Sequence, residues 1–297
     1  PGLVRAADLA KRLQAGTEKL SILDASWYLP AQQRNAKAEF QARRVQGAKF
    51  FDLDNCFSDK STTLPHMLPP AAQFSSSIRR LGVAPGDFVV AYDGSGIMSA
   101  PRAWWTFLYF GWDPARVAVL DGGFPKFEKE FPELVEKVAL SDADMVEDER
   151  RLQVTTSAYE PRPQSHLLRS MADIVANLQS GAEQVVDARN AGRFTGTEQE
   201  PRPGLPSGHM PDAANVFFGD VLQDGQLRAA ADIRSAFAAA GAPLDGKPIV
   251  TSCGSGVTAA VLALALTASG HEGHALYDGS WTEYADPAAK NVIEAQK

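Results

Sequence analysis

Short apolar runs alternate with longer amphipathic stretches along most of the chain. Residues 6–13 and 101–110 carry apolar side chains at helical spacing. A strand begins at residues 22–23, and residues 88–91 and 117–120 are short apolar runs typical of strands buried on both faces. This alternation predicts an α/β fold, with a mainly parallel sheet flanked by helices on both faces.

The same pattern occurs twice. "DFVVAYDGSG" at 87–96 matches "KPIVTSCGSG" at 247–256, and "VLDGGFPKF" at 119–127 matches "LYDGSWTEY" at 276–284. Three further segments match in the same order, each displaced by roughly 160 residues. Collinear matches of this kind indicate a duplicated domain.

The segment between the two copies has a different character. It is acidic at first and then rich in proline, with little periodicity, which is typical of a linker. We therefore predict two tandem domains, residues 1–138 and residues 166–297, joined by a linker over residues 139–165.

Composition and charge narrow the classes of function. Hydrophobic residues make up 44% of the 297 positions and charged residues 22%, as in ordinary globular proteins with a sizeable core. The net charge of −7 argues against nucleic acid as a partner, because phosphate backbones are bound by basic surfaces. The most apolar stretch, residues 257–268, is too short to cross a bilayer, so we expect no membrane partner.

The two cysteines, Cys56 and Cys253, do not form a disulfide framework, which suggests a reducing compartment such as the cytoplasm or the mitochondrial matrix. The five histidines are scattered, and no group of Cys and His has zinc spacing. We expect no metal and no organic cofactor. Two covalently joined copies already build the cleft between the domains, so a monomer is the expected state.

Cys253 follows a strand that ends at residues 249–250 and precedes an apolar helix that starts near Val257. Glycines in such a loop allow successive N–H groups to point inward, and the helix start adds a partial positive charge. This cradle lowers the pKa of a thiol and stabilises a thiolate nucleophile. A free cysteine is more often a buried structural residue. The loop favours the nucleophile for Cys253, whereas Cys56 has no such surroundings and is expected to be structural.

The first copy has Asp93 where the second has Cys253, so only one copy carries a nucleophile. A cysteine phosphatase would need an arginine six positions after the cysteine, where this chain has Ala259, and the loop holds no basic residue. A thiol protease would need a local histidine signature, which is missing.

The motifs "CGSGVTA", "SAPRAWW", "LDGG", "GRFTGTEQEPRPG", "SGHMPDA" and "YDGSW" together cover nearly the whole chain. On these motifs the sequence resembles the two-domain rhodanese-type sulfurtransferases. The resemblance implies two rhodanese-like domains, of which the first is not catalytic. The neutral loop is similar to that of the branch that uses 3-mercaptopyruvate, whereas the thiosulfate-using branch carries basic residues after its cysteine. The alternatives are thiosulfate sulfurtransferase activity and a non-catalytic rhodanese-like binding module.

The resemblance also implies the site residues. Arg193 and Arg202 match positions that bind the carboxylate and carbonyl of the substrate, and a guanidinium fork suits a carboxylate. Arg189 is interpreted as a structural ion-pair residue. Ser255, His66 and Asp54 match a relay beside the substrate, in which a base orients a hydroxyl and an acid orients the base. The remaining substrate-binding positions are in the loop itself: Gly254, Gly256, Val257 and Thr258.

The reaction that the resemblance implies passes through a Cys253 persulfide. The thiolate takes sulfur from 3-mercaptopyruvate, pyruvate leaves, and the loop N–H groups stabilise the outer sulfur. A second thiophile then accepts the sulfur, either a dithiol such as thioredoxin, a small thiol, or cyanide.

Overall fold

A computed structural model describes residues 2–16 and 19–295 of the chain. The described chain divides into two compact units. The first unit comprises residues 1–60, 68–164 and 224–226, and the second comprises residues 61–67, 165–223 and 227–297. No helix in the described ranges is both long enough and apolar enough to cross a membrane.

The first unit is built on a five-stranded sheet in the order β1-β6-β5-β2-β4, and every pair in it is parallel. Its strands are β1 (Gly2–Val4), β2 (Leu20–Asp24), β4 (Lys49–Phe50), β5 (Phe88–Tyr92) and β6 (Val117–Leu120). A separate antiparallel pair is formed by β3 (Arg44–Val45) and β7 (Val135–Glu136). Its helices are α1 (Ala6–Ala15), α2 (Ala36–Ala42), α3 (Ala71–Arg80), α4 (Ala100–Tyr109), α5 (Gly123–Glu130) and α6 (Asp142–Thr155).

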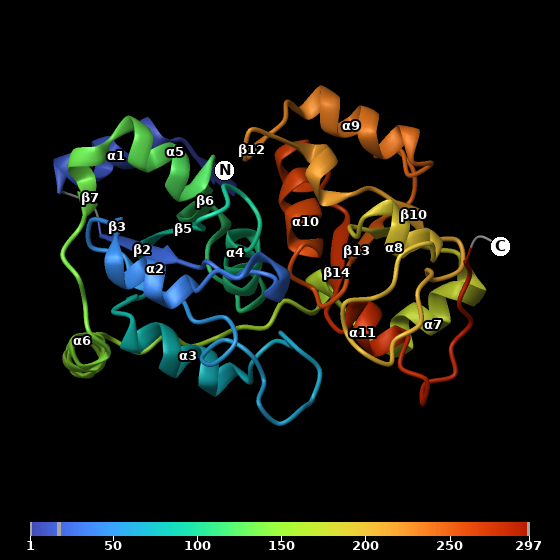
Figure 1. Cartoon of the computed structure of the whole chain (residues 1–297), viewed down its shortest axis with the longest axis horizontal. Coiled ribbons are helices and arrows are strands. Elements are labelled where there is room, and N and C mark those ends of the chain that lie inside the picture. Colours follow the sequence, from blue (N-terminus) through green and yellow to red (C-terminus); the bar gives the residue numbers. More distant parts are fainter. Residues whose placement is uncertain (1, 17–18, 296–297) are drawn as a thin grey trace. The chain divides into compact units, whose positions relative to one another are not determined.

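Helices lie on both sides of this sheet (Figure 1), and apolar side chains pack on each face. On one face Leu9 of α1 and Phe127 of α5 are fully buried in a cluster with Val90 of β5. On the other side lie aromatic residues of α3 and α4, where the Phe74 and Phe107 rings meet edge to face with centroids 5.3 Å apart. Burial on both faces explains why the strands are apolar runs without alternation.

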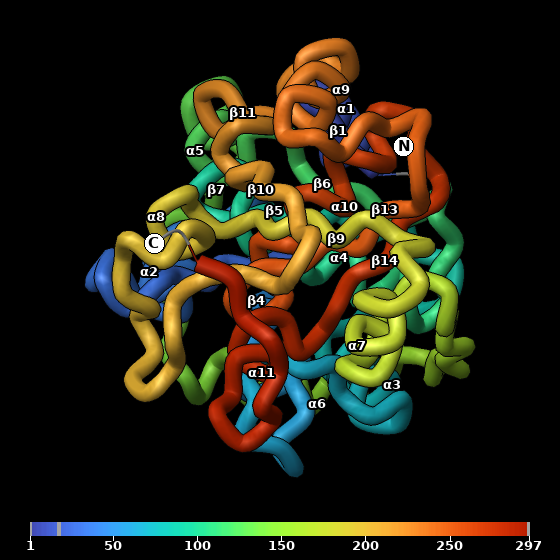
Figure 2. Tube along the Cα trace, turned by 90° about the vertical axis from the view of Figure 1, so that its right-hand side faces the viewer, coloured from blue at the N-terminus to red at the C-terminus, as the bar shows by residue number. Residues whose placement is uncertain are grey.

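The second unit repeats this sheet. Its order is β10-β9-β13-β14-β8, again all parallel, and four of these strands, β10, β9, β13 and β14, are labelled in Figure 2. The strands are β8 (Leu168–Arg169), β9 (Gln184–Asp187), β10 (Ala214–Asn215), β13 (Ile249–Ser252) and β14 (His274–Tyr277). The helices are α7 (Met171–Ser180), α8 (Ala191–Thr195), α9 (Ala230–Ala239), α10 (Ala259–Ala268) and α11 (Ser280–Tyr284). Two further short strands, β11 (Leu222–Gln223) and β12 (Gln226–Leu227), pair with each other.

Helix α10 is the core of the second unit. Residues 259–266 are all fully buried, which agrees with their apolar composition on every side of the helix. The helix packs against β13, β14 and α9, while α7 and α11 cover the other face with Ile174 and Trp281 (Figure 1). The loop before α10 is therefore held by a rigid strand on one side and a buried helix on the other.

The two units have equivalent strand orders, since β8, β14, β13, β9 and β10 correspond in turn to β1, β6, β5, β2 and β4. This confirms the predicted fold class of two tandem α/β domains with parallel sheets. The predicted elements are present as α1, β2, β5, α4 and β6. The helix expected from Val257 begins at Ala259.

The segment predicted as a linker contains helix α6, which the sequence pattern did not indicate. A capping box between Ser141 and Asp144 starts this helix, and Arg150 and Arg151 pair with acids one turn earlier. None of its residues is fully buried, so it lacks the apolar periodicity that predicts a helix. It packs against α3.

Candidate active site

Cys253 lies in the loop that joins β13 to α10, and α11 anchors this loop. The Cys253 N–H donates to Ser280 Oγ at 3.2 Å, and its carbonyl accepts from the Trp281 N–H at 2.9 Å. The carbonyl of Gly254 accepts from both the N–H and the Oγ1 hydroxyl of Thr282, at 3.0 and 2.6 Å. These four hydrogen bonds fix the backbone that carries the cysteine.

The sulfur itself accepts a hydrogen bond. The Gly256 N–H lies 3.1 Å from Cys253 Sγ, and Gly256 has φ of 78°, a left-handed conformation that glycine adopts without strain. Val257 is buried, and Thr258 is the N-cap of α10. Cys253 is 2% exposed, so burial alone would fit a structural cysteine. The N–H at its sulfur and the charged groups over the next residue favour a site instead.

Ser255 and His66 are in direct contact. His66 Nδ1 lies 2.9 Å from Ser255 Oγ, and both side chains are about 95% buried. His66 has φ of 63°, an unfavourable backbone conformation for a residue other than glycine that is found where a structure holds functional groups. The Ser255 hydroxyl also accepts from Arg202 Nη2 at 3.2 Å. A hydroxyl between an imidazole and a guanidinium is oriented on both sides.

Two guanidinium groups lie over Gly254. A Cβ built on this glycine would be 3.0 Å from Arg193 Nη2 and 3.4 Å from Arg202 Nη1. Glycine at this position therefore makes room for both arginines. The structure brings Arg193 and Arg202, which lie nine residues apart in the motif "GRFTGTEQEPRPG", to the residue after Cys253.

A buried network of ions holds Arg193 in place. Glu200 accepts from Arg193 Nε at 3.0 Å and from Arg193 Nη2 at 2.6 Å, and its side chain is 1% exposed. It also accepts from Arg189 Nη1 at 2.7 Å, and Arg189 forms further hydrogen bonds to Asp187. Burial opposes the charge on Arg189, but the two carboxylates outweigh it and hold its pKa above the usual value. Arg189 is thus a structural ion-pair residue, whereas the end of Arg193 faces the loop.

Asp54 belongs to the first unit. There its carboxylate accepts from Trp27 Nε1 at 3.1 Å. The contact between Ser255 and His66 is present within the second unit, and the part of Asp54 in the relay stays a prediction.

Cys56 has different surroundings from Cys253. It is partly exposed, and Arg80 Nη2 lies 3.4 Å from its sulfur. Burial raises the pKa of the Cys56 thiol, which is the opposite of what a nucleophile requires. In the described part of the chain, no cluster of three or more His, Cys, Asp or Glu side chains could hold a metal ion.

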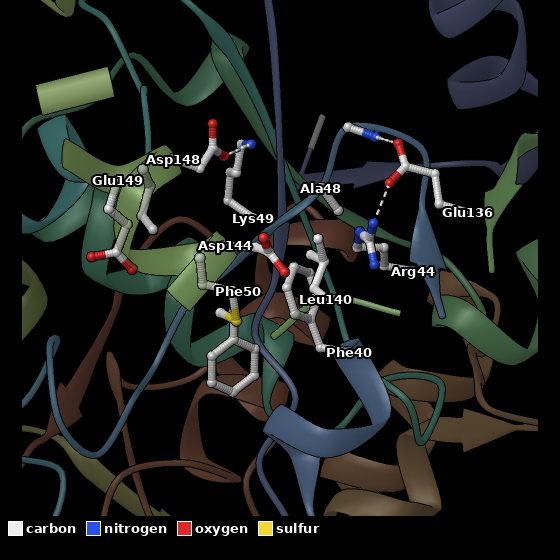
Figure 3. Close-up of a pocket in the computed structure, with 13 residues that line it drawn as sticks. Phe40, Arg44, Ala48, Lys49, Phe50, Glu136, Leu140, Asp144, Asp148 and Glu149 are labelled. Atoms are coloured by element: carbon white, nitrogen blue, oxygen red, sulfur yellow. Dashed lines mark hydrogen bonds and ion pairs between the residues drawn. The ribbon is translucent and has the colours of Figure 1, made fainter. Parts of the chain in front are cut away.

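A pocket of about 250 Å³ in the first unit contains none of the candidate residues. It lies beside α6, and four of its charged lining residues form two ion pairs, Arg44 with Glu136 and Lys49 with Asp148 (Figure 3). The pocket contains no cysteine. Cys253 lies in the loop over which two guanidinium groups lie, and this loop is the candidate site.

Sequence reasoning missed three residues of this site. Glu200 resembles any surface acid in "TEQEPRPG". Ser280 ends the second-copy motif "YDGS" and Thr282 lies two residues later, and neither residue shows a sign of its contacts in the sequence. Ser280 and Thr282 lie 27 and 28 residues from their partners Cys253 and Gly254, so local spacing carries no signal of these contacts. Repetition of the "DGG" and "DGS" turns in both copies was the only available hint.

The fold and the loop define a class: tandem α/β domains with a cysteine in an N–H-lined loop at the carboxyl end of a central parallel strand. The family model "Rhodanese-like domain" matches residues 5–130 and 170–287. The chain therefore belongs to the rhodanese-like family, with two copies of its domain.

Curated relatives are enzymes of sulfur transfer. The chain is 40% identical over 287 residues to the human 3-mercaptopyruvate sulfurtransferase, which covers 95% of this chain and 91% of the relative. It is 40% identical over 276 residues to the mitochondrial thiosulfate/3-mercaptopyruvate sulfurtransferase 1 of Arabidopsis thaliana, over 90% and 72% of the two chains. Among solved structures, the Tum1 protein of Saccharomyces cerevisiae matches with a TM-score of 0.85 and 30% identity, over 99% and 98% of the chains.

Proposed function

We propose that this chain is a sulfurtransferase that moves sulfur from 3-mercaptopyruvate, through a persulfide on Cys253, to a thiol or cyanide, and releases pyruvate. The observation that carries this proposal is the set of charges over the Cys253 loop. The loop from Gly254 to Thr258 is neutral, and two guanidinium ends lie over Gly254. These are the groups that a small α-keto acid requires beside a nucleophilic sulfur.

The net charge of the network favours a donor with a single charge. It contains three guanidinium groups and two carboxylates, which leave one net positive charge, and its members are Asp187, Arg189, Arg193, Glu200 and Arg202. 3-Mercaptopyruvate has one carboxylate, whereas thiosulfate has two negative charges. Charge complementarity therefore supports 3-mercaptopyruvate over thiosulfate.

Arg193 has hydrogen-bonding capacity left for a substrate. Its Nε and one proton of Nη2 bind Glu200, so the outer edge formed by Nη1 and Nη2 remains for a carboxylate. Arg202 lies beside it and also donates to Ser255. In our proposal these two arginines hold the carboxylate and the ketone, with the donor sulfur directed at Cys253.

Sulfur transfer begins with attack of the Cys253 thiolate on the donor sulfur. A sulfur–sulfur bond forms, the carbon–sulfur bond of the donor breaks, and its electron pair leaves with carbon as the pyruvate enolate. The enolate needs a proton, which the Ser255 hydroxyl supplies with His66 at its other side. Asp54 completes the relay in this proposal by orienting the imidazole.

The persulfide is held as an anion until an acceptor arrives. Its inner sulfur keeps the hydrogen bond from the Gly256 N–H, and the loop N–H groups that precede α10 stabilise the outer sulfur. The acceptor thiolate then attacks that outer sulfur, which restores the Cys253 thiolate. We propose thioredoxin, a small thiol or cyanide as acceptors, and a monomer in the cytoplasm or the mitochondrial matrix.

Steady-state kinetics with 3-mercaptopyruvate and thiosulfate, measured side by side, test the assignment. We expect a higher kcat/KM with 3-mercaptopyruvate, and no turnover of either donor by Cys253→Ser. Preference for thiosulfate would assign the chain to the thiosulfate-using branch. The Arabidopsis relative, whose name includes both donors, makes this comparison necessary. Turnover by Cys253→Ser would remove the mechanism, and a wild-type chain inert with both donors would favour a binding module.

A further inference from the structure

The first unit contains a loop with the same sequence pattern as the Cys253 loop. "DGSGIMSA" at 93–100 follows β5 and leads into α4, as "CGSGVTAA" at 253–260 follows β13 and leads into α10. The glycines and the serine are identical in the two loops, and Asp93 takes the place of Cys253. The contacts of the Asp93 carboxylate therefore show how such a loop binds an anion that belongs to the chain itself.

Four backbone N–H groups converge on the Asp93 carboxylate, which is fully buried. Oδ1 accepts from the N–H of Ser95 at 2.9 Å. Oδ2 accepts from the N–H groups of Met98, Ser99 and Ala100 at 2.8, 2.9 and 2.9 Å. Three of the four donors lie at the start of α4, where the helix dipole also favours negative charge. Both oxygens accept hydrogen bonds from backbone N–H donors, the arrangement expected of a bound carboxylate ion.

A second feature of the Cys253 site is repeated here as well. Arg34 Nε donates to Glu39 at 2.9 Å and Arg34 Nη2 donates to it at 2.6 Å, the same two-pronged pairing that Arg193 makes with Glu200. A Cβ on Gly94 would lie 3.1 Å from Arg34 Nη2, as a Cβ on Gly254 would lie 3.0 Å from Arg193 Nη2. In the first unit the Tyr28 hydroxyl is nearer still, and Arg34 Nη1 and Nη2 donate to the Gly94 carbonyl at 3.2 and 3.3 Å.

The arginine–glutamate pair of the first unit comes from a different place in the repeat than the pair of the second unit. Arg34 precedes α2 and its Glu39 partner is on α2, five residues later, whereas Arg193 and Glu200 are seven residues apart around α8. The arrangement of groups is shared although the repeat does not align these residues.

A small pocket opens onto this loop. It has a volume of about 80 Å³, and its lining includes Gly94, Arg34 and Glu39. Burial raises the pKa of Asp93, although the four N–H groups oppose this effect. The loop, the arginine fork and the pocket thus form the parts of a binding site around a group that belongs to the chain itself.

We propose that the first unit holds a second anion-binding site, built like the site around Cys253, in which the Asp93 carboxylate is the bound anion. The ligand class of this site is a small carboxylate of the size of formate. Because Asp93 occupies the site, the first unit is closed to external anions. The proposal concerns anion binding alone and holds whichever sulfur donor the second unit uses.

Removal of the carboxylate tests the proposal by chemical rescue. Asp93→Ala leaves four N–H donors without an acceptor, so we expect a lower melting temperature than that of the wild type. Sodium formate should raise the melting temperature of Asp93→Ala in a saturable way. This rise should exceed the rise that formate causes in the wild type by several degrees.

Asp93→Asn is the matched control, because its amide fills the same space without a charge. Formate should act on it as on the wild type, which separates binding in the vacated site from a general effect of salt. A formate response of Asp93→Ala parallel to that of Asp93→Asn and the wild type would overturn the proposal.

A second variant decides the question if Asp93→Ala does not fold. Asp93→Cys, combined with Cys56→Ser and Cys253→Ser, places the only thiol of the chain in the first loop. Titration by thiolate absorbance should give a pKa at least about one unit below the reference value near 8.5. A pKa at or above that reference would show that the loop does not stabilise an anion and would refute the proposal.

Discussion

The Glu200 carboxylate sets the charge that a sulfur donor meets over the Cys253 loop. It is almost fully buried and binds Arg189 and Arg193 together. Glu200→Gln keeps the shape of the side chain and removes one negative charge, so the network gains a second net positive charge. We expect the preference among donors to shift toward thiosulfate, because a dianion gains more than a monoanion from each added positive charge.

The geometry gives the size of this shift. Arg193 Nη2 is 2.6 Å from Glu200 Oε2, and one further hydrogen bond separates the guanidinium from a bound donor, which places the donor charge about 6 Å from Glu200. At an effective dielectric constant of about 20 to 40, one unit charge at this distance is worth about 1.4 to 2.8 kcal/mol. The ratio of kcat/KM for thiosulfate to kcat/KM for 3-mercaptopyruvate should therefore rise about 10- to 100-fold.

The assay compares both donors for the wild type, Glu200→Gln and Glu198→Gln. The Glu198 control makes the same change of charge at an exposed side chain that binds Asn190, where solvent screens it. It should leave the ratio within about twofold of the wild type. An unchanged ratio in Glu200→Gln, or an equal shift in Glu198→Gln, would refute the idea that the buried network selects the donor by charge.

Three further outcomes follow from the geometry. Gly254→Ala places a Cβ 3.0 Å from Arg193 Nη2, so the guanidinium must move, and kcat/KM should fall about 10- to 100-fold at an unchanged melting temperature. Unchanged kinetics would contradict the role of Arg193 in holding the substrate. Ser255→Ala removes the hydroxyl that His66 contacts, so kcat with 3-mercaptopyruvate should fall at least about 100-fold. The kcat with thiosulfate should hardly change, because its sulfite product needs no proton, and equal losses with both donors would exclude a proton-transfer role. Burial raises the pKa of Asp24 to about 7, above its unfolded value near 4, so its contribution to folding stability is present below about pH 4 and is lost, on the order of 4 kcal/mol, as the pH rises to 7. The free energy of unfolding of Asp24→Asn, measured by denaturation, should therefore depend less on pH than that of the wild type, and identical slopes would be the contrary result.

The parts of this protein that were predictable are those encoded by local pattern or by repetition. Apolar runs buried on both faces gave the strands, and the duplicated "GSG" motif gave the strand-to-helix loops at Asp93 and Cys253. Helix α6 was missed because none of its residues is fully buried, and only half-buried residues such as Met145 and Leu152 form its packed face. The sequence signal for a helix is mainly a clear apolar stripe, and in α6 acidic and basic side chains interrupt it.

The candidate site was predictable only in part. The loop and the residues Arg193, Arg202 and Ser255 were found from motifs, and the structure places them together. Glu200 was missed because an acid near an arginine is usually a solvated surface pair, and only burial distinguishes this one. The separate roles of Arg189 and Arg193 likewise depend on which guanidinium is enclosed, and that is a property of the fold.

The most direct test is the mass of the peptide that contains Cys253 after the protein has been exposed to 3-mercaptopyruvate without an acceptor. The account predicts an increase by one sulfur atom on this peptide, no increase on the peptide that contains Cys56, and loss of the added sulfur when a thiol acceptor is supplied. Turnover of the donor with Cys253 at its unmodified mass throughout would contradict the account.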